Sequence, residues 1–102
     1  MGAGVTIPLP HHATPGTGPT IVFLPGYASD MAGSKALALE DWARSNGRAF
    51  VRFDYRGHGE DRANFTRYTL DDWRDDAVAV IDGIAGPVVL VGSSMGGWIM
   101  LL

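Results

Sequence analysis

One stretch decides the fold: VVLVGSSMGGW, at residues 88–98. Its four leading apolar residues predict a strand buried on both faces of a parallel sheet. Gly97 to Leu102 predict the start of a buried helix. Between them, the turn from Gly92 to Gly96 fits the pattern G-x-S-x-G, in which a serine is held on a sharp strand-to-helix bend. Glycines are needed on both sides because the serine backbone is strained and its neighbours pack closely. Ser94 is therefore the candidate nucleophile.

The same five residues have a simpler interpretation, a glycine-rich turn before a helix. The chain contains 14 glycines and five serines, so composition alone would produce the pattern in about one such chain in ten. The buried strand before the turn and the apolar residues after it favour the nucleophile turn.

The rest of the chain alternates strands and helices. Two further strands are predicted, at 21–24 and 49–54, with helices at 34–46 and 70–84. Gly47 is the expected left-handed stop of the first helix, and Thr69 with Asp72 resembles a capping box at the start of the second. Such alternation predicts an α/β fold in three α/β/α layers around a mostly parallel sheet. Residues 1–19 are interpreted as a leader or edge segment, with a short strand at 5–7, and residues 20–102 as the domain itself.

Ligands of parallel sheets bind beyond the carboxyl ends of the strands. Gly26-Tyr27, the loop 54–59 and Ser94 all follow predicted strands. An acyl-transfer enzyme stabilises its oxyanion with backbone N–H groups, one from the residue after the nucleophile and one from an earlier loop. We therefore expect Met95 and Tyr27 to be the oxyanion donors; the alternative for Pro25-Gly26-Tyr27 is an ordinary turn at the end of a strand.

These segments together resemble the α/β-hydrolase family. The run DYRGHG at 54–59 resembles the loop after the fourth strand of that fold. More narrowly, the chain is similar to the group of mycophenolic-acid acyl-glucuronide esterase, palmitoyl-protein thioesterase and their bacterial relatives. The matching stretches are FLPGY at 23–27, Gly33 with KALA at 35–38, RFDY at 52–55 and GSSMGGW at 92–98, within a likeness that covers residues 19–102.

This resemblance implies ester or thioester hydrolysis by a Ser-Asp-His triad, on a small-molecule or acylated substrate, without a cofactor. Glu60-Asp61 follow Gly59 where the family commonly has serine, which weakens the narrower grouping. In this fold the acid and the histidine follow the serine in chain order. We expect both beyond Leu102, with the fold truncated after the nucleophile turn and the 102 residues inactive alone. The alternative is an inert fragment or a scaffold protein of the same fold, with its third predicted strand left as an open edge.

The histidines within the chain are weaker candidates for the base. His58 lies in the loop after the second predicted strand, where the family's histidine is structural. His11 and His12 are expected to be solvated in the proline-rich leader; as a pair they could bind a metal ion, but a third ligand is lacking, so no metal site is predicted.

The sequence also predicts roles for several other side chains. Asp54 is expected to organise the glycine turn that follows it rather than to be the triad acid. Four aspartates around Trp73 are expected to form a solvated face at a helix N-terminus: Asp71, Asp72, Asp75 and Asp76. Met31 and Trp98 are candidates for an acyl pocket, with Trp98 equally suited to the core.

Composition excludes other classes. The formal net charge is -3 and the chain has no cysteine, so a nucleic-acid partner and thiol chemistry are not expected. No apolar run approaches the roughly 18 residues of a membrane span. Without a signal segment we expect a cytoplasmic protein, with mitochondria as the alternative, and the oligomeric state stays open.

Overall fold

The computed structural model describes residues 6–27 and 30–101. Its elements, in chain order, are β1 (His11–Thr14), β2 (Thr17–Leu24), α1 (Ser34–Ser45), β3 (Arg48–Phe53), the 3₁₀ segment η1 (Gly59–Arg67), α2 (Leu70–Asp82), β4 (Val88–Gly92) and α3 (Met95–Ile99). The sheet has the order β1-β3-β2-β4. β2 pairs in parallel with both β3 and β4, and β1 pairs antiparallel with β3. The mostly parallel sheet is confirmed.

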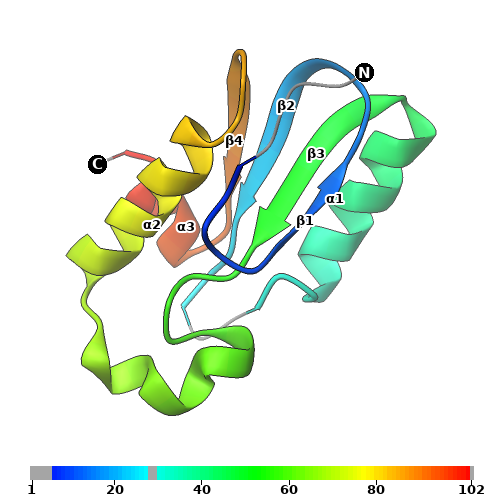
Figure 1. The fold of residues 1–102 in the computed structure, drawn as a ribbon. Helices are drawn as coiled ribbons and strands as arrows, with labels where there is room; N and C mark the ends of the chain where they lie inside the picture. Colours follow the sequence, from blue (N-terminus) through cyan, green and yellow to red (C-terminus); the bar gives the residue numbers. More distant parts are fainter. Residues whose placement is uncertain (1–5, 28–29, 102) are drawn as a thin grey trace.

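Helices cover both faces of the sheet, which confirms the three layers (Figure 1). α1 lies on one face and α2 with α3 on the other. Alternate residues of β2 enter the two cores: Val22 and Leu24 pack with Trp73 and Val80 of α2, whereas Ile21 and Phe23 pack with the alanines of α1. All four residues are buried, as the continuous apolar run predicts.

The predicted stop after α1 and the predicted capping box at the start of α2 are confirmed, although α2 ends at Asp82 rather than at residue 84. Gly47 follows α1 with φ +65°, a left-handed conformation that glycine adopts without strain. At α2 the Thr69 hydroxyl accepts from the N–H of Asp72 at 3.4 Å, and the Asp72 carboxylate accepts from the N–H of Thr69 at 2.9 Å. This reciprocal capping box satisfies two backbone donors that the first turn leaves without helical partners.

Two parts of the chain differ from the sequence-based expectation. The first described strand is β1 at 11–14 rather than a strand at 5–7; Val5 lies outside the described residues, and the N–H of Thr6 bonds to the carbonyl of Gly83 at 2.8 Å. η1 was not predicted because it lacks apolar periodicity. It is held by polar turn contacts, in which Asp61 accepts from the N–H of Gly57 at 2.8 Å and from the Asn64 amide at 2.7 Å.

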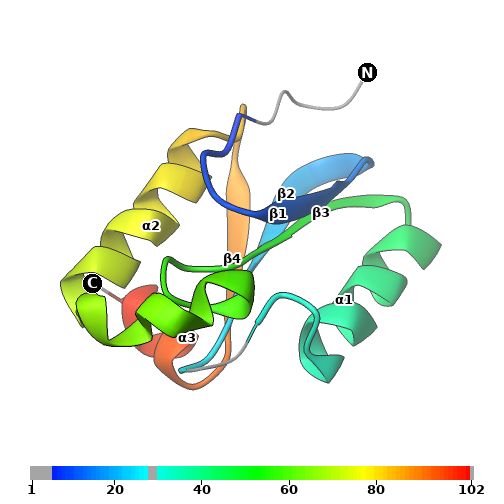
Figure 2. The ribbon, with the colours of Figure 1, turned by 60° about the horizontal axis from the view of Figure 1, so that its bottom comes forward.

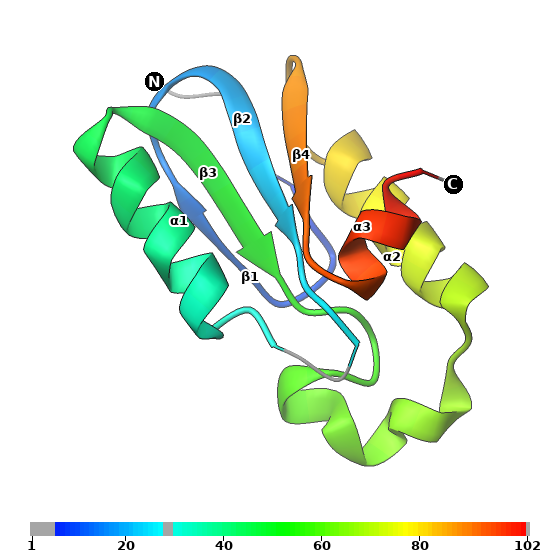
Figure 3. The ribbon, with the colours of Figure 1, turned by 180° about the vertical axis from the view of Figure 1, so that it is seen from behind.

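β4 is an edge of the sheet, beside α3 (Figure 3). Val89 is 44% exposed, and the side chains of Trp98 and Leu101 are also exposed. The open edge expected for the third predicted strand is therefore present in this chain. No helix in the described ranges is long and apolar enough to cross a membrane.

Candidate active site

Ser94 lies on a strained backbone at the junction of β4 and α3. Its φ of 54° and ψ of -115° make it the one non-glycine residue with positive φ in the described part of the chain. Its side chain is at the exposed tip of the bend. Ser93 fastens the bend to the sheet, because its N–H donates to the carbonyl of Leu24 at 3.2 Å. An L-residue is held in such a conformation only where the surroundings over-determine it.

The flanking glycines are required by close backbone approach, as the sequence predicted. A Cβ on Gly96 would overlap the carbonyl oxygen of Leu24 and come within 2.9 Å of the carbonyl oxygen of Pro25. A Cβ on Gly92 would lie 2.5 Å from the backbone nitrogen of Gly97. Distances below 3.0 Å cannot be accommodated without a backbone shift, so the turn is shaped by the absence of side chains.

The loop after β2 lies directly beside this bend, at the carboxyl ends of the parallel strands (Figure 2). Tyr55, which follows β3, donates its hydroxyl to the carbonyl of Pro25 at 3.1 Å. Tyr27 is 60% exposed, and its ring stands edge-on to Phe65 of η1 at 5.0 Å and to Trp73 of α2 at 6.0 Å. The first turn of α3 and the Pro25–Tyr27 loop are thus neighbours, which is the proximity that two oxyanion donors require.

His58 is buried in an aromatic cluster. It is 2% exposed, and its ring packs edge-on against Tyr55, Phe65 and Trp73 at centroid distances of 5.0–5.4 Å. Its Nδ1 lies 3.3 Å from the carbonyl oxygen of Arg56. These surroundings favour the structural interpretation of this histidine over a role as the base.

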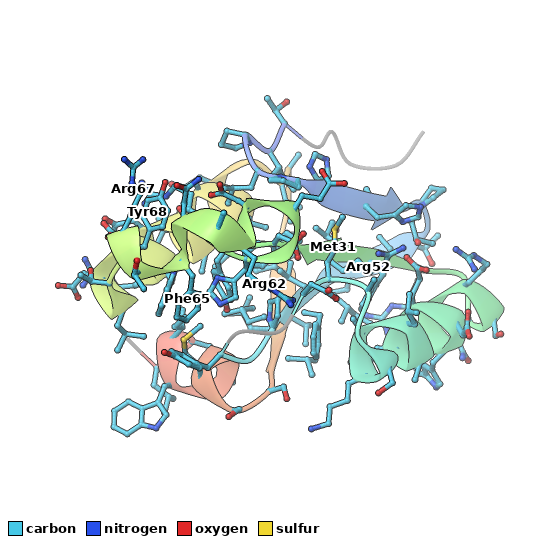
Figure 4. All side chains as sticks on the ribbon, turned by 90° about the horizontal axis from the view of Figure 1, so that it is seen from below. Met31, Arg52, Arg62, Phe65, Arg67 and Tyr68 are labelled. Atoms are coloured by element: carbon cyan, nitrogen blue, oxygen red, sulfur yellow. The ribbon has the colours of Figure 1, made fainter. Side chains whose placement is uncertain are left out.

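Asp54 joins the end of β3 to the start of α1. Its carboxylate accepts a 2.6 Å hydrogen bond from the N–H of Met31, and Arg52 donates to the carbonyl of Met31 at 3.2 Å. Figure 4 shows Met31 and Arg52 side by side. Gly59 lies against the carboxylate, where a Cβ would overlap it. Burial raises the pKa of Asp54 and the Met31 bond opposes that shift. The contact with Gly59 agrees with the expected role in the glycine turn; the bond to Met31 was not anticipated.

The expectation of four solvated aspartates at the start of α2 is wrong for Asp76. It is buried, and it accepts from the Nε of Arg56 at 2.7 Å and from the backbone N–H of Arg56 at 2.8 Å. Burial raises the pKa of Asp76, against the effect of these bonds. The signal was present in the sequence, because Asp76 stands three residues after Trp73 and four before Val80, on the buried stripe.

Met31 and Trp98, the two candidates for an acyl pocket, do not line the same cavity. Met31 lines a hollow of about 290 Å³ with Pro10, Asp54 and Gly59, and Trp98 is not in that wall. Trp98 is 68% exposed, so it does not belong to the core of this chain.

An open hollow of about 480 Å³ lies beside Ser94 on the α1 face. Its walls include Phe23, Leu39 and Val91. At its rim Lys35 donates to the hydroxyl of Ser93 at 3.3 Å. The hollow reaches Ser94, and its apolar walls come from β2, α1 and β4.

His11 and His12 belong to β1, where His12 is exposed and His11 is half-buried. The Nδ1 of His12 lies 3.0 Å from the carboxylate of Glu40, and the Nδ1 of His11 lies 2.8 Å from the carbonyl of Leu9. Across residues 6–27 and 30–101, no three His, Cys, Asp or Glu side chains gather as a metal ion would require.

Comparison with known proteins agrees with this fold. The profile of the alpha/beta hydrolase family matches residues 21–102. The chain therefore belongs to the alpha/beta hydrolase family, and the resemblance found in the sequence is confirmed.

The chain is also similar to individual proteins of known name. The chain is 52% identical over 87 residues to the mitochondrial palmitoyl-protein thioesterase ABHD10 of Homo sapiens, covering 84% of this chain and 28% of that protein. The Rattus norvegicus counterpart is 49% identical over 87 residues, covering 84% and 29%. This chain spans less than a third of the length of these curated relatives.

Solved structures give the same result. Mouse alpha/beta hydrolase domain-containing protein 10 superposes with a TM-score of 0.85 at 42% identity, covering 99% of this chain and 43% of that one. A putative hydrolase from Agrobacterium vitis S4 gives a TM-score of 0.74 at 38% identity, covering 92% and 44%.

Proposed function

We propose that this chain carries the nucleophile and the oxyanion donors of a hydrolase that cleaves carboxylic esters or thioesters. The observation that carries the proposal is the backbone of Ser94, held at positive φ on an exposed bend between β4 and α3. That geometry presents a serine hydroxyl to a substrate at the edge of an α/β sheet. The thioesterase names of the relatives support an acylated substrate.

In the proposed reaction the Ser94 hydroxyl attacks the substrate carbonyl carbon and forms a tetrahedral intermediate. The N–H groups of Met95 and Tyr27 stabilise its oxyanion. Collapse releases the alcohol or thiol and leaves an acyl-enzyme, which water then hydrolyses. The approach of Gly96 to the carbonyl of Pro25 supports this assignment, because Met95 directly precedes Gly96 and Tyr27 lies two residues after Pro25.

The base of this reaction is assigned to residues outside the chain. His58 is buried and packed against three aromatic rings, which leaves it poorly placed to exchange protons with Ser94. We assign the general base to a histidine past Leu102, oriented by an aspartate that precedes it, in the order that this fold uses. The greater length of the relatives leaves room for both residues.

The hollow beside Ser94 indicates the class of substrate, and the names of the relatives indicate the location. The apolar walls of the hollow beside Ser94 suit an acyl chain. Met31 and Trp98 stay candidates for substrate contact, from two separate positions. The curated relatives are named as mitochondrial, so they support the mitochondrial alternative and give no support to a cytoplasmic location.

The test is covalent labelling of the natural protein with a fluorophosphonate, read by intact mass, together with hydrolysis of an acyl thioester. Ser94→Ala should lose the label and reduce turnover by at least about 10⁴-fold. Ser93→Ala, which removes the neighbouring hydroxyl, is the matched control and should keep the label. Turnover that survives in Ser94→Ala would contradict the proposal.

A further inference from the structure

Three segments meet at the carbonyl of Pro25. The loop itself leaves the end of β2 at this residue. The hydroxyl of Tyr55 donates to the carbonyl oxygen at 3.1 Å. The backbone of Gly96 in α3 comes so close that a Cβ there would lie 2.9 Å from the same oxygen. The position of this oxygen therefore links the loop after β2 to the first turn after Ser94.

The Tyr55 side chain is fixed more firmly than a surface tyrosine would be. It is 1% exposed, and its ring stands edge-on to Phe53 at 5.0 Å and to His58 at 5.4 Å. Burial raises the pKa of Tyr55, so the hydroxyl stays protonated and remains a donor. A buried hydroxyl without its partner would be costly, and the bond to Pro25 supplies that partner.

The loop is held a second time at Tyr27. The Tyr27 ring contacts Phe65 and Trp73, from η1 and α2, and Figure 4 shows Phe65 on η1 at the carboxyl ends of the strands. Between the two anchors lies Gly26, the residue with the greatest backbone freedom. Because a peptide unit is planar, fixing the carbonyl of Pro25 also fixes the N–H of Gly26. The N–H of Tyr27 then depends on the two backbone torsions of Gly26, which are bounded on the other side by the ring contacts of Tyr27.

We propose that Tyr55 is a positioning residue for the hydrolysis: through the carbonyl of Pro25 it aims the N–H of Tyr27 at the place where the oxyanion forms. The inference rests on the proposed function, because it assigns a role within that same site. Tyr55 does not touch the substrate. It acts on the transition state through the loop, so its loss should reduce kcat and leave KM unchanged.

Tyr55→Phe removes this one oxygen and keeps the ring. The matched control is Tyr68→Phe, which removes the same atom from a half-buried tyrosine whose ring lies 5.2 Å from the Arg56 guanidinium and would be retained. With an acyl thioester as substrate and the natural protein as enzyme, Tyr55→Phe should lower kcat about tenfold or more, since an oxyanion donor contributes about 10²–10³-fold. KM should change less than about twofold. Tyr68→Phe should leave both constants within about twofold.

Inhibitor binding to Tyr55→Phe distinguishes a misplaced oxyanion donor from a general loss of site structure. A trifluoromethyl ketone analogue, which forms a tetrahedral oxyanion on a serine, should bind Tyr55→Phe more weakly by about the factor lost in kcat. A thioether analogue of the substrate, which forms no oxyanion, should bind it as the unchanged protein does. Equal weakening of both analogues would overturn the inference, because a purely structural role predicts it.

The outcomes also separate this inference from the proposed function. If Ser94→Ala is inactive while Tyr55→Phe keeps kcat within twofold, the positioning role fails and the proposed function stands. If Ser94→Ala stays active, the proposed function fails. Should Tyr55→Phe not fold, Phe65→Leu tests the second anchor of the loop: kcat should fall at least threefold at constant KM, and an unchanged kcat would overturn the inference.

Discussion

The two halves of the candidate site are built in opposite ways. The bend at Ser94 is shaped by missing side chains, since Gly92 and Gly96 leave no room for a Cβ. Pro25, Tyr27 and Met31 are instead held by side chains from other segments, namely Tyr55 and Asp54 just after β3 and Phe65 in η1. The bend is therefore fixed by close backbone packing, including that against Leu24 and Pro25, whereas Pro25, Tyr27 and Met31 depend on side chains at least 23 positions away in the chain.

That difference predicts different responses to mutation. In the bend, a single added methyl group collides with backbone that cannot move independently. In the loop, the removal of one anchor leaves the others in place. Substitutions in the bend should therefore cost the most stability, and the loss of a single loop anchor should cost less.

The largest effect is expected at Gly96. Gly96→Ala places a Cβ against the carbonyl of Leu24, and overpacking against backbone should lower the free energy of unfolding by about 3 kcal/mol or more. Urea unfolding measures it. Gly97→Ala is the matched control, because a Cβ there would lie 4.0 Å from the carbonyl oxygen of Gly92 and alanine is the better helix former by about 1 kcal/mol. Equal losses in the two variants would contradict the steric account of the bend.

An intermediate effect is expected at Asp54. Asp54→Ala leaves the N–H of Met31 without its acceptor at a partly buried position, which should lower the free energy of unfolding by about 2 kcal/mol. Asp54→Asn keeps an oxygen acceptor and should recover more than half of that loss. If alanine and asparagine were equally destabilising in urea unfolding, the bond to Met31 would not be the reason that Asp54 matters.

The smallest effect is expected at Glu40 of α1. Arg52 donates to its carboxylate at 2.8 Å and this bond, with the charges of Arg52, His12 and Arg44, lowers the pKa of Glu40 despite its burial. A depressed carboxyl pKa contributes stability that is present above the ordinary value of 4.5 and is lost as the pH falls through the folded-state pKa.

Glu40→Gln keeps the shape of the side chain and removes the charge. It should lower the free energy of unfolding by about 1 kcal/mol at pH 7, and the difference should shrink as the pH falls below 4.5. Thermal or urea unfolding at pH 7 and pH 3.5 measures this. A difference that is the same at both pH values would rule out the ionised carboxylate as its source.

Much of the fold could be predicted from the sequence because its signals are local. The apolar run at 21–24, the stop at Gly47 and the capping box at Thr69 each depend on neighbouring residues, and each is confirmed. The bend at Ser94 has the backbone that the glycine spacing predicts. β1 and η1 were missed, since one is a short strand held by pairing with β3 and the other a 3₁₀ segment held by polar contacts.

The supports of the loop could not be predicted in the same way. Tyr55 and Pro25 are 30 residues apart, and so neither residue type nor spacing announces their hydrogen bond. The prediction for Asp76 is wrong for a different reason: four aspartates close together suggest a solvated face, but Asp76 lies on the buried stripe and its partner Arg56 is 20 residues away. Sequence patterns record what a segment does by itself, and contacts between segments leave little trace in them.

The backbone of Ser94 also has a consequence for how relatives of this chain could diverge. Glycine and asparagine adopt positive φ more readily than serine does, so Ser94→Gly or Ser94→Asn would relieve a cost that the fold itself does not need. A lineage that kept the scaffold but abandoned the reaction would gain stability by either change. The residue at position 94 would then distinguish catalytically active relatives from inactive ones, even where the rest of the sequence had hardly changed.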